Sequence, residues 1–190
     1  MGRRLLFLGP PGAGKGTQAV MLARALGVPH LSTGDMLRRA VSEGTELGRQ
    51  AEAIMTAGDL VPDDLVVAMV GERLAEPDAA CGYLLDGFPR NVAQAEALRA
   101  GLVDDGIELV VLLDVDEDEL VTRLLGRAAA LGRTDDNEET IRRRLAVYRS
   151  ETAPLAEHYP GTGVEVVAVE GTGTIDEVFA RIVGALAAER

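Results

Sequence analysis

Cysteine, lysine and long apolar runs are all scarce in this chain of 190 residues. Cys81 is the only cysteine, which excludes an internal disulfide and a zinc site built from cysteines. No apolar run approaches the roughly 18 residues of a membrane-spanning helix. The four apolar residues after Arg4 are too few for a signal peptide, and Leu6 stands where a myristoylation signal needs serine or threonine. The sequence therefore predicts a cytoplasmic protein.

Positive charge is also scarce. The chain has 19 Lys and Arg against 31 Asp and Glu, a net charge of −12. Such a field repels nucleic acids and anionic membranes, so we expect neither as a partner. Nucleotides are anions too, and binding them requires a local cluster of basic side chains. The length and the 47% hydrophobic content predict one folded domain with small insertions, which we expect to be a monomer.

Lys15, the only lysine, lies in the stretch Gly9 to Thr17, GPPGAGKGT. An apolar run precedes this stretch, and a pattern of apolar residues at helical spacing follows it. Glycines between a strand and a helix let backbone N–H groups turn toward a phosphate, and the helix start adds a positive dipole end. The spacing matches the Walker A motif, in which the lysine reaches the β- and γ-phosphates.

One position departs from that motif. Gly16 occupies the place of the usual serine or threonine, and Thr17 follows one residue later. Direct ligation of magnesium by a hydroxyl group is therefore not assured here. The alternative interpretation, a glycine-rich turn with no ligand, is weaker because the complete spacing is far more specific than a lone GxGxxG.

Short apolar runs alternate with helical patterns along the whole chain. This alternation predicts a doubly wound α/β fold with a five-stranded parallel sheet. The strands are expected at residues 4–8, 30–32, 83–86, 109–114 and 164–169. Between Gly44 and Gly58 we expect short helices separated by glycine, and in 128–132 a loop of small residues. The closing helix is expected to bury Ile175, Val178, Phe179, Ile182 and Leu186.

Two predicted strands end on an aspartate, Asp86 and Asp114. In parallel sheets, ligands bind at the carboxyl ends of the strands, the edge that also carries the phosphate loop. Either aspartate could hold magnesium. We favour Asp86, because Gly87-Phe88-Pro89-Arg90 places an anion-binding arginine beside it.

Arg144 lies on the apolar stripe of a predicted helix, between Ile141 and Leu145. An unpaired guanidinium that faces inward costs several kcal/mol. Arg144 therefore either pairs with a buried acid or faces a crevice that holds an anion. Arg142 and Arg143 point elsewhere, and we interpret them as solvated surface residues.

Taken together, these segments resemble the adenylate kinase family over nearly the whole chain. In this family Gly-Thr follows the lysine, as Gly16-Thr17 does here. The segments that carry the resemblance are GPPGAGKGT (9–17), STGDMLR (32–38), LVPDDLV (60–66), LLDGFPRNVAQ (84–94), RLLGR (123–127), RTDDNEET (133–140) and VEGT (169–172).

The resemblance implies a P-loop NTPase core at 1–30, 61–125 and 137–190, a nucleoside-monophosphate-binding insert at 31–60 and a short lid at 126–136. It implies ATP, AMP and ADP as substrates and Mg²⁺ as cofactor, held by Asp86 through water. The catalytic residues implied are Lys15, Arg90, Arg123, Arg133 and Arg144. Those for ATP are Gly12, Ala13, Gly14, Lys15, Gly16, Thr17, Arg123, Arg127 and Gly171. Those for AMP are Thr33, Arg38, Leu60, Val61, Gly87, Arg90, Gln94, Arg133 and Arg144.

The expected reaction is reversible transfer of a phosphoryl group from MgATP to AMP, giving two ADP. The nearest alternative is a UMP/CMP kinase of the same fold, suggested by Asn91. Gln94 and Thr33 favour AMP. A non-catalytic nucleotide-binding regulator is a more distant alternative, and a switch GTPase is excluded because its base-reading motif needs a second lysine.

Overall fold

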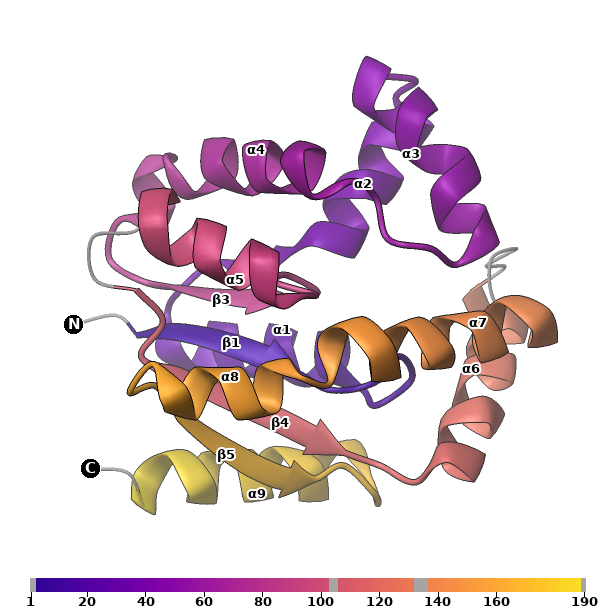
Figure 1. Ribbon diagram of the computed structural model, residues 1–190. Helices are drawn as coiled ribbons and strands as arrows, with labels where there is room; N and C mark the ends of the chain where they lie inside the picture. The colour runs from indigo at the N-terminus through magenta and orange to yellow at the C-terminus, as the bar shows by residue number, and fades with distance from the viewer. Residues whose placement is uncertain (1–2, 103–105, 132–136, 189–190) are drawn as a thin grey trace.

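The computed structural model describes residues 3–102, 106–131 and 137–188 of the chain. Five strands form one parallel sheet in the order β2-β3-β1-β4-β5. The strands are β1 (Arg4–Leu8), β2 (His30–Ser32), β3 (Tyr83–Asp86), β4 (Leu109–Asp114) and β5 (Glu165–Glu170). The predicted five-stranded parallel sheet is confirmed, and its first strand lies at its centre (Figure 1).

Nine α-helices occur in the described part of the chain, together with a 3₁₀ turn, η1 (Pro77–Ala79), and two π-helical turns, η2 (Leu98–Leu102) and η3 (Tyr148–Thr152). The α-helices are α1 (Lys15–Leu26), α2 (Thr33–Ser42), α3 (Glu46–Ala57), α4 (Asp63–Leu74), α5 (Val92–Ala97), α6 (Glu117–Leu131), α7 (Glu138–Val147), α8 (Leu155–Gly161) and α9 (Ile175–Ala188).

The sheet is covered on both faces, and the side chains of β1 alternate between two hydrophobic clusters. Leu5 and Phe7 pack with α1, α6, α7 and α9 on one face. Leu6 and Leu8 pack with α2, α3, α4, α5 and α8 on the other (Figure 1). This double covering explains why the strand is a continuous apolar run, and it confirms the doubly wound architecture.

Helices α2 and α3 project together from the rest of the molecule (Figure 1). We expected short helices separated by glycine here, but α3 continues through Gly48. A Cβ atom at this position would lie 2.1 Å from the carbonyl oxygen of Ala40, so glycine lets the two backbones touch. The role of Gly48 is therefore close packing and not helix termination.

Two further predictions about helices were wrong. Residues 128–131 belong to α6, where we expected a loop, because alanine and leucine are strong helix formers. The predicted lid 126–136 thus begins inside a helix, and its residues 132–136 lie outside the described part. Ile175 is 55% exposed because it is the first residue of α9, whereas Val178 and Ile182 are buried as predicted.

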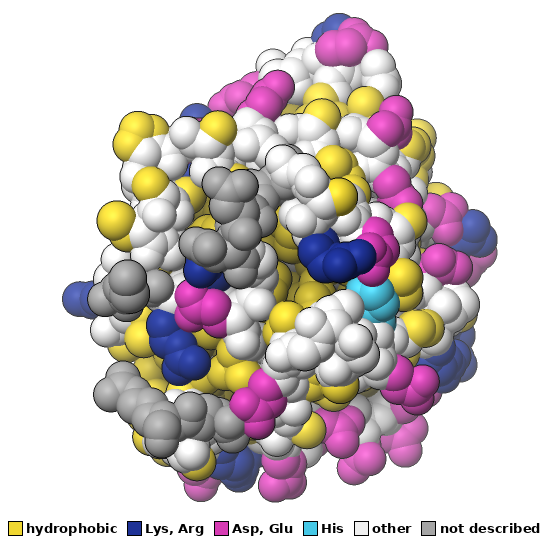
Figure 2. All heavy atoms as spheres, turned by 60° about the vertical axis from the view of Figure 1, so that its left-hand side comes forward, with side chains coloured by type: hydrophobic (Ala, Val, Ile, Leu, Met, Phe, Trp, Pro, Cys, Tyr) yellow, Lys and Arg dark blue, Asp and Glu magenta, His cyan; other side chains and the backbone are white. Residues whose placement is uncertain are grey.

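The end of the molecule on the left of Figure 1, away from the carboxyl ends of the strands, is turned forward in Figure 2. Acidic side chains are spread over this face among hydrophobic and a few basic ones, in keeping with the net charge of −12 (Figure 2). Within the described residues, no helix is both long enough and apolar enough to cross a membrane.

Candidate nucleotide-binding site

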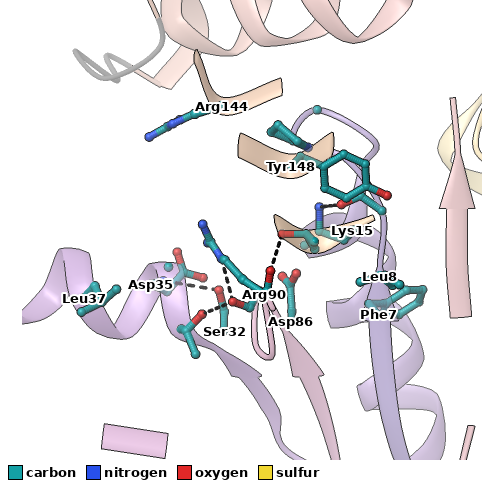
Figure 3. A pocket seen from close by; sticks show the side chains of 18 of the residues that line it. Phe7, Leu8, Lys15, Ser32, Asp35, Leu37, Asp86, Arg90, Arg144 and Tyr148 are labelled. Carbon is teal, nitrogen blue, oxygen red and sulfur yellow. Dashed lines mark hydrogen bonds between the residues drawn. The ribbon is translucent and has the colours of Figure 1, made fainter. Parts of the chain in front are cut away.

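A cavity of about 710 Å³ opens where the carboxyl ends of β1, β2 and β3 meet helices from the second half of the chain. Figure 3 shows its centre, with Lys15 beside the strand end of β1, Asp86 at the end of β3 and Arg144 entering from α7. Segments more than a hundred residues apart in the sequence thus contribute to one cavity, as expected at the carboxyl edge of a parallel sheet.

The loop between β1 and α1 forms one wall of this cavity. Gly9, Gly12 and Gly14 have φ values of 142°, 88° and 92°, a region that favours glycine. A Cβ atom at Gly9 would lie 2.7 Å from the carbonyl oxygen of Leu113, so the loop passes directly against β4. No side chain caps the start of α1. Its first N–H groups can therefore bind a phosphate.

Lys15 is the first residue of α1, and its side chain folds back along the loop. Nζ donates hydrogen bonds to the carbonyl oxygens of Gly9, at 2.7 Å, and Pro10, at 2.9 Å. These contacts hold the ammonium group at the loop, on the wall of the cavity (Figure 3). The predicted phosphate loop is thus formed, with its one positive charge in place.

Asp86 ends β3 opposite the start of α1. Its side chain is largely buried, and Oδ2 lies 3.3 Å from Nε2 of His30. A Cβ atom at Gly16 would lie 3.5 Å from the same oxygen, so the carboxylate faces the phosphate loop. Among the described residues, no group of three or more His, Cys, Asp or Glu side chains could hold a metal ion by itself.

Arginines from three elements approach the same cavity. Arg90 follows β3, Arg38 lies in α2 and Arg144 in α7, and all three line the cavity. Burial lowers the pKa of Arg90. The Asp86 carboxylate raises it, and the positive charges of Arg144 and Arg38 lower it further. Like charges this close favour an anion between them.

The loop after β3 holds Arg90 in position. Arg90 Nε and Thr33 Oγ1 both donate to the carbonyl oxygen of Gly87, each at 2.8 Å. Gly87 has a φ of 79°, and a Cβ atom there would lie 3.0 Å from Thr33 Oγ1. In Figure 3 the guanidinium group of Arg90 points up into the cavity, toward the side from which Arg144 enters. Glycine at position 87 thus permits the contact that positions the arginine.

On the other side of the phosphate loop, Arg123 of α6 lines the cavity. Its Nη2 donates to the carbonyl oxygen of Gly171 at 3.0 Å and also contacts Glu119. The N–H of Gly171 in turn donates to the carbonyl oxygen of Asp114 at 2.8 Å. The structure therefore brings together Arg123 and Gly171, two residues for which the family resemblance implies contact with ATP.

Most of the predicted site residues line this cavity. They are Gly12, Gly14, Lys15, Gly16, Thr17, Thr33, Arg38, Leu60, Val61, Asp86, Gly87, Arg90, Gln94, Arg123 and Arg144. Ala13 and Gly171 are not among the residues that line it, and the side chain of Ala13 is buried in the hydrophobic core. Arg133 and the side chain of Arg127 lie outside the described part of the chain.

Gln94 is buried at 2% exposure, and protein groups already bind its amide. Oε1 accepts from the backbone N–H of Arg90 at 2.7 Å, and Nε2 donates to Asp63 Oδ1 at 2.6 Å. Sequence reasoning did not foresee these bonds, which join residues from different elements. They leave the amide one acceptor position and one N–H for a ligand.

Sequence reasoning did not assign Thr152 or Tyr148 to the site. Both belong to the π turn η3 and line the cavity. Thr152 Oγ1 donates to the carbonyl oxygen of Arg90 at 2.7 Å and so supports the arginine from behind. A π turn is not visible as a sequence pattern, although such turns are frequent at functional sites.

Arg143 is an exposed surface residue, as predicted, but it also forms an ion pair that the sequence did not reveal. Its Nε and Nη2 donate to the two carboxylate oxygens of Asp59, at 2.6 and 2.7 Å. These bonds lower the pKa of Asp59. Asp59 follows α3, so the ion pair joins the projecting helices to α7, a long-range contact that a helical pattern cannot reveal. Arg142 is exposed as expected and pairs with Glu138 on its own helix.

Comparison with known proteins agrees with this geometry. The sequence model of the family described as "Adenylate kinase" matches residues 7–164. A protein named "Adenylate kinase" from Thermobifida fusca (strain YX) is 55% identical over 96% of this chain and 97% of its own length. Proteins of the same name from Synechococcus sp. (strain RCC307) and Thermus thermophilus are 56% and 55% identical over 98% of this chain, covering 100% and 98% of their own lengths. The family match spans most of the chain, and the chain therefore belongs to the adenylate kinase family.

Proposed function

We propose that this protein transfers the γ-phosphoryl group of MgATP to AMP, reversibly, and gives two ADP. The observation that carries the proposal is the convergence of Arg38, Arg90 and Arg144 on a cavity whose opposite wall is the phosphate loop with Lys15. Such a cavity suits two anionic groups placed end to end. Family membership supports the same reaction.

The chemistry needs no activated nucleophile, because the phosphate of AMP is already an anion. Its oxygen attacks the γ-phosphorus in line as the bond to the β-phosphate oxygen breaks. On this proposal, the loop N–H groups and Lys15 hold the ATP phosphates, while Arg90 and Arg144 hold the AMP phosphate and the group in transfer. Catalysis then consists of alignment and neutralisation of charge, together with exclusion of water.

The donor groups fit a magnesium ion that is shared with the nucleotide. Asp86 supplies one carboxylate facing the loop, and Mg²⁺ usually keeps several waters and binds through one or two carboxylates and the phosphates of a substrate. Asp86 would hold it through water. When bound, the ion would neutralise negative charge on the phosphates.

Segments 31–60 and 126–136 are proposed to act as the monophosphate-binding insert and the lid. The ion pair of Asp59, which follows α3, with Arg143 of α7 supports a closing role for the first segment. A closed site would keep water from the γ-phosphoryl group. That the protein is a cytoplasmic monomer remains a prediction from the sequence. Gel filtration would test the oligomeric state.

Incubation with MgATP and AMP should yield ADP, and ATP alone should be hydrolysed far more slowly, because both nucleotides are needed to fill the site. The measurement is a coupled assay of ADP formation with AMP, CMP, UMP or no acceptor. Hydrolysis of ATP alone as fast as transfer to AMP would contradict the proposal. A preference for UMP or CMP would indicate the related kinase instead.

Gln94→Leu should raise the KM for AMP and narrow the preference for AMP over CMP and UMP. The reason is that a site which hydrogen-bonds its base discriminates far better than an apolar pocket. Melting temperature must be measured in parallel, because the variant also removes a partner from Asp63 and from the N–H of Arg90. Unchanged selectivity would place base recognition at the backbone near Leu60 and Val61.

A further inference from the structure

Asp63 forms a hydrogen-bonded cluster with Asn91 and Gln94 at the start of two helices. Asp63 is the first residue of α4, and Asn91 caps α5 by accepting from the N–H of Gln94 at 2.8 Å. Asn91 Nδ2 donates to both oxygens of Asp63, at 3.0 and 3.1 Å, and Gln94 Nε2 donates to Oδ1 at 2.6 Å. The carboxylate therefore receives donors from two side chains of one helical turn.

This cluster fixes the direction of the Gln94 amide. A carboxylate can only accept hydrogen bonds, and the backbone N–H of Arg90 can only donate. If the amide turned by 180°, its oxygen would face Asp63 and its NH₂ group would face the N–H of Arg90. Both hydrogen bonds would then be replaced by repulsive contacts, and the amide is buried, where unsatisfied polar groups are costly.

The two internal bonds leave the amide with one free acceptor position on its oxygen and one free N–H. Gln94 lines the cavity, so this acceptor and donor pair is what it can offer to a base. Adenine complements the pair, because its 6-amino group donates and a neighbouring ring nitrogen accepts. A 6-oxo purine carries a carbonyl oxygen in place of the amino group and an N–H at N1, so on the edge that includes N1 its donor and acceptor are reversed.

We propose that Asp63 is a specificity-determining positioning residue, which locks the Gln94 amide in the direction that accepts 6-amino purines and rejects 6-oxo purines. The inference rests on the proposed function, since it requires the base of the monophosphate to meet Gln94. A glutamine free to turn would accommodate both kinds of base, so the discrimination lies in Asp63 and not in Gln94 alone.

The test compares AMP with inosine monophosphate, whose base has an oxygen in place of the 6-amino group and an N–H at the adjacent ring position. In Asp63→Asn the new side chain can donate or accept, so it no longer opposes a turn of the Gln94 amide, and only the N–H of Arg90 still does. We expect the ratio of kcat/KM for AMP to that for inosine monophosphate to fall by about 10-fold or more, the size of one paired base contact. The KM for ATP should stay unchanged.

Asp64→Asn is the matched control, because Asp64 is exposed and lies in the same first turn of α4. It removes the same charge from the helix start and should leave the AMP preference as it is. If Asp63→Asn melts below the assay temperature, Asp63→Ser replaces it, since a hydroxyl group also both donates and accepts.

An unchanged AMP preference in the folded variant, even with a lower melting temperature, would overturn the proposal and make Asp63 a structural tie between α4 and α5. An equal loss of preference in Asp64→Asn would overturn it as well. Failure of the proposed function is separate, because it would appear in the unsubstituted protein as a lack of ADP formation from AMP.

Discussion

Lys15→Arg should lower kcat by about 10²-fold or more, the loss expected when one preorganised charge is misplaced in an active site. The ammonium group of Lys15 lies within hydrogen-bond distance of Gly9 and Pro10 in a loop that folds tightly around it. Arginine carries the same charge on a larger planar group, which cannot occupy this space. The measurement is the coupled assay with a thermal melt beside it.

Arg24→Lys serves as the control, because it exchanges the same two residue types at an exposed position in the last turn of α1. It should leave both turnover and melting temperature almost unchanged. A Lys15→Arg protein that melts normally and keeps near full turnover would show that Lys15 is not the phosphate ligand. A large fall in melting temperature would mean that the loop itself had been disturbed.

Arg144→Ala should lower kcat by on the order of 10³-fold, as for other arginines that contact a phosphoryl group in transfer. Its neighbours Ile141 and Leu145 are buried, and Arg144 itself points into the cavity (Figure 3). The control variant is Arg143→Ala, which removes a guanidinium group from the preceding residue of α7. We expect that variant to keep kcat within about threefold.

Because Arg143 pairs with Asp59, Arg143→Ala also removes an ion pair, and the effect of that loss must be measured separately. Loss of an exposed ion pair should have little effect on melting temperature. Asp59→Asn should reproduce whatever effect Arg143→Ala has, and neither should approach that of Arg144→Ala. Equal kinetic losses at positions 143 and 144 would contradict the assignment of Arg144 to the phosphoryl group. A large fall in melting temperature for Arg144→Ala would indicate a pairing role instead.

The sheet and the phosphate loop could be predicted because their signals are local. An apolar run such as Leu5–Leu8 must be buried on both faces, and glycines with a lysine between a strand and a helix have few other uses. Asp86 could be predicted as a site residue because ligands bind at the carboxyl ends of parallel strands, and Asp86 ends β3. Patterns of this kind depend on neighbours in the sequence.

The sequence could not predict contacts between distant segments. From the sequence, the whole amide of Gln94 is expected to be available for a base. In the structure, Nε2 donates one hydrogen bond to Asp63, which lies 31 residues earlier. Arg143 looks solvated until Asp59 is placed opposite it. The extension of α6 to Leu131 was missed for a different reason, because small residues were interpreted as a loop although alanine favours a helix.

The central place of β1 has a consequence for the order in which the chain can fold. Leu5 pairs with Leu84 on one side and with Leu109 on the other. During synthesis, β1 therefore leaves the ribosome before both of its partners. It stays unpaired until β3 is made, and one of its edges stays unpaired until β4 follows. A nascent chain released before that point exposes an apolar strand with an open edge, the kind of segment that aggregates.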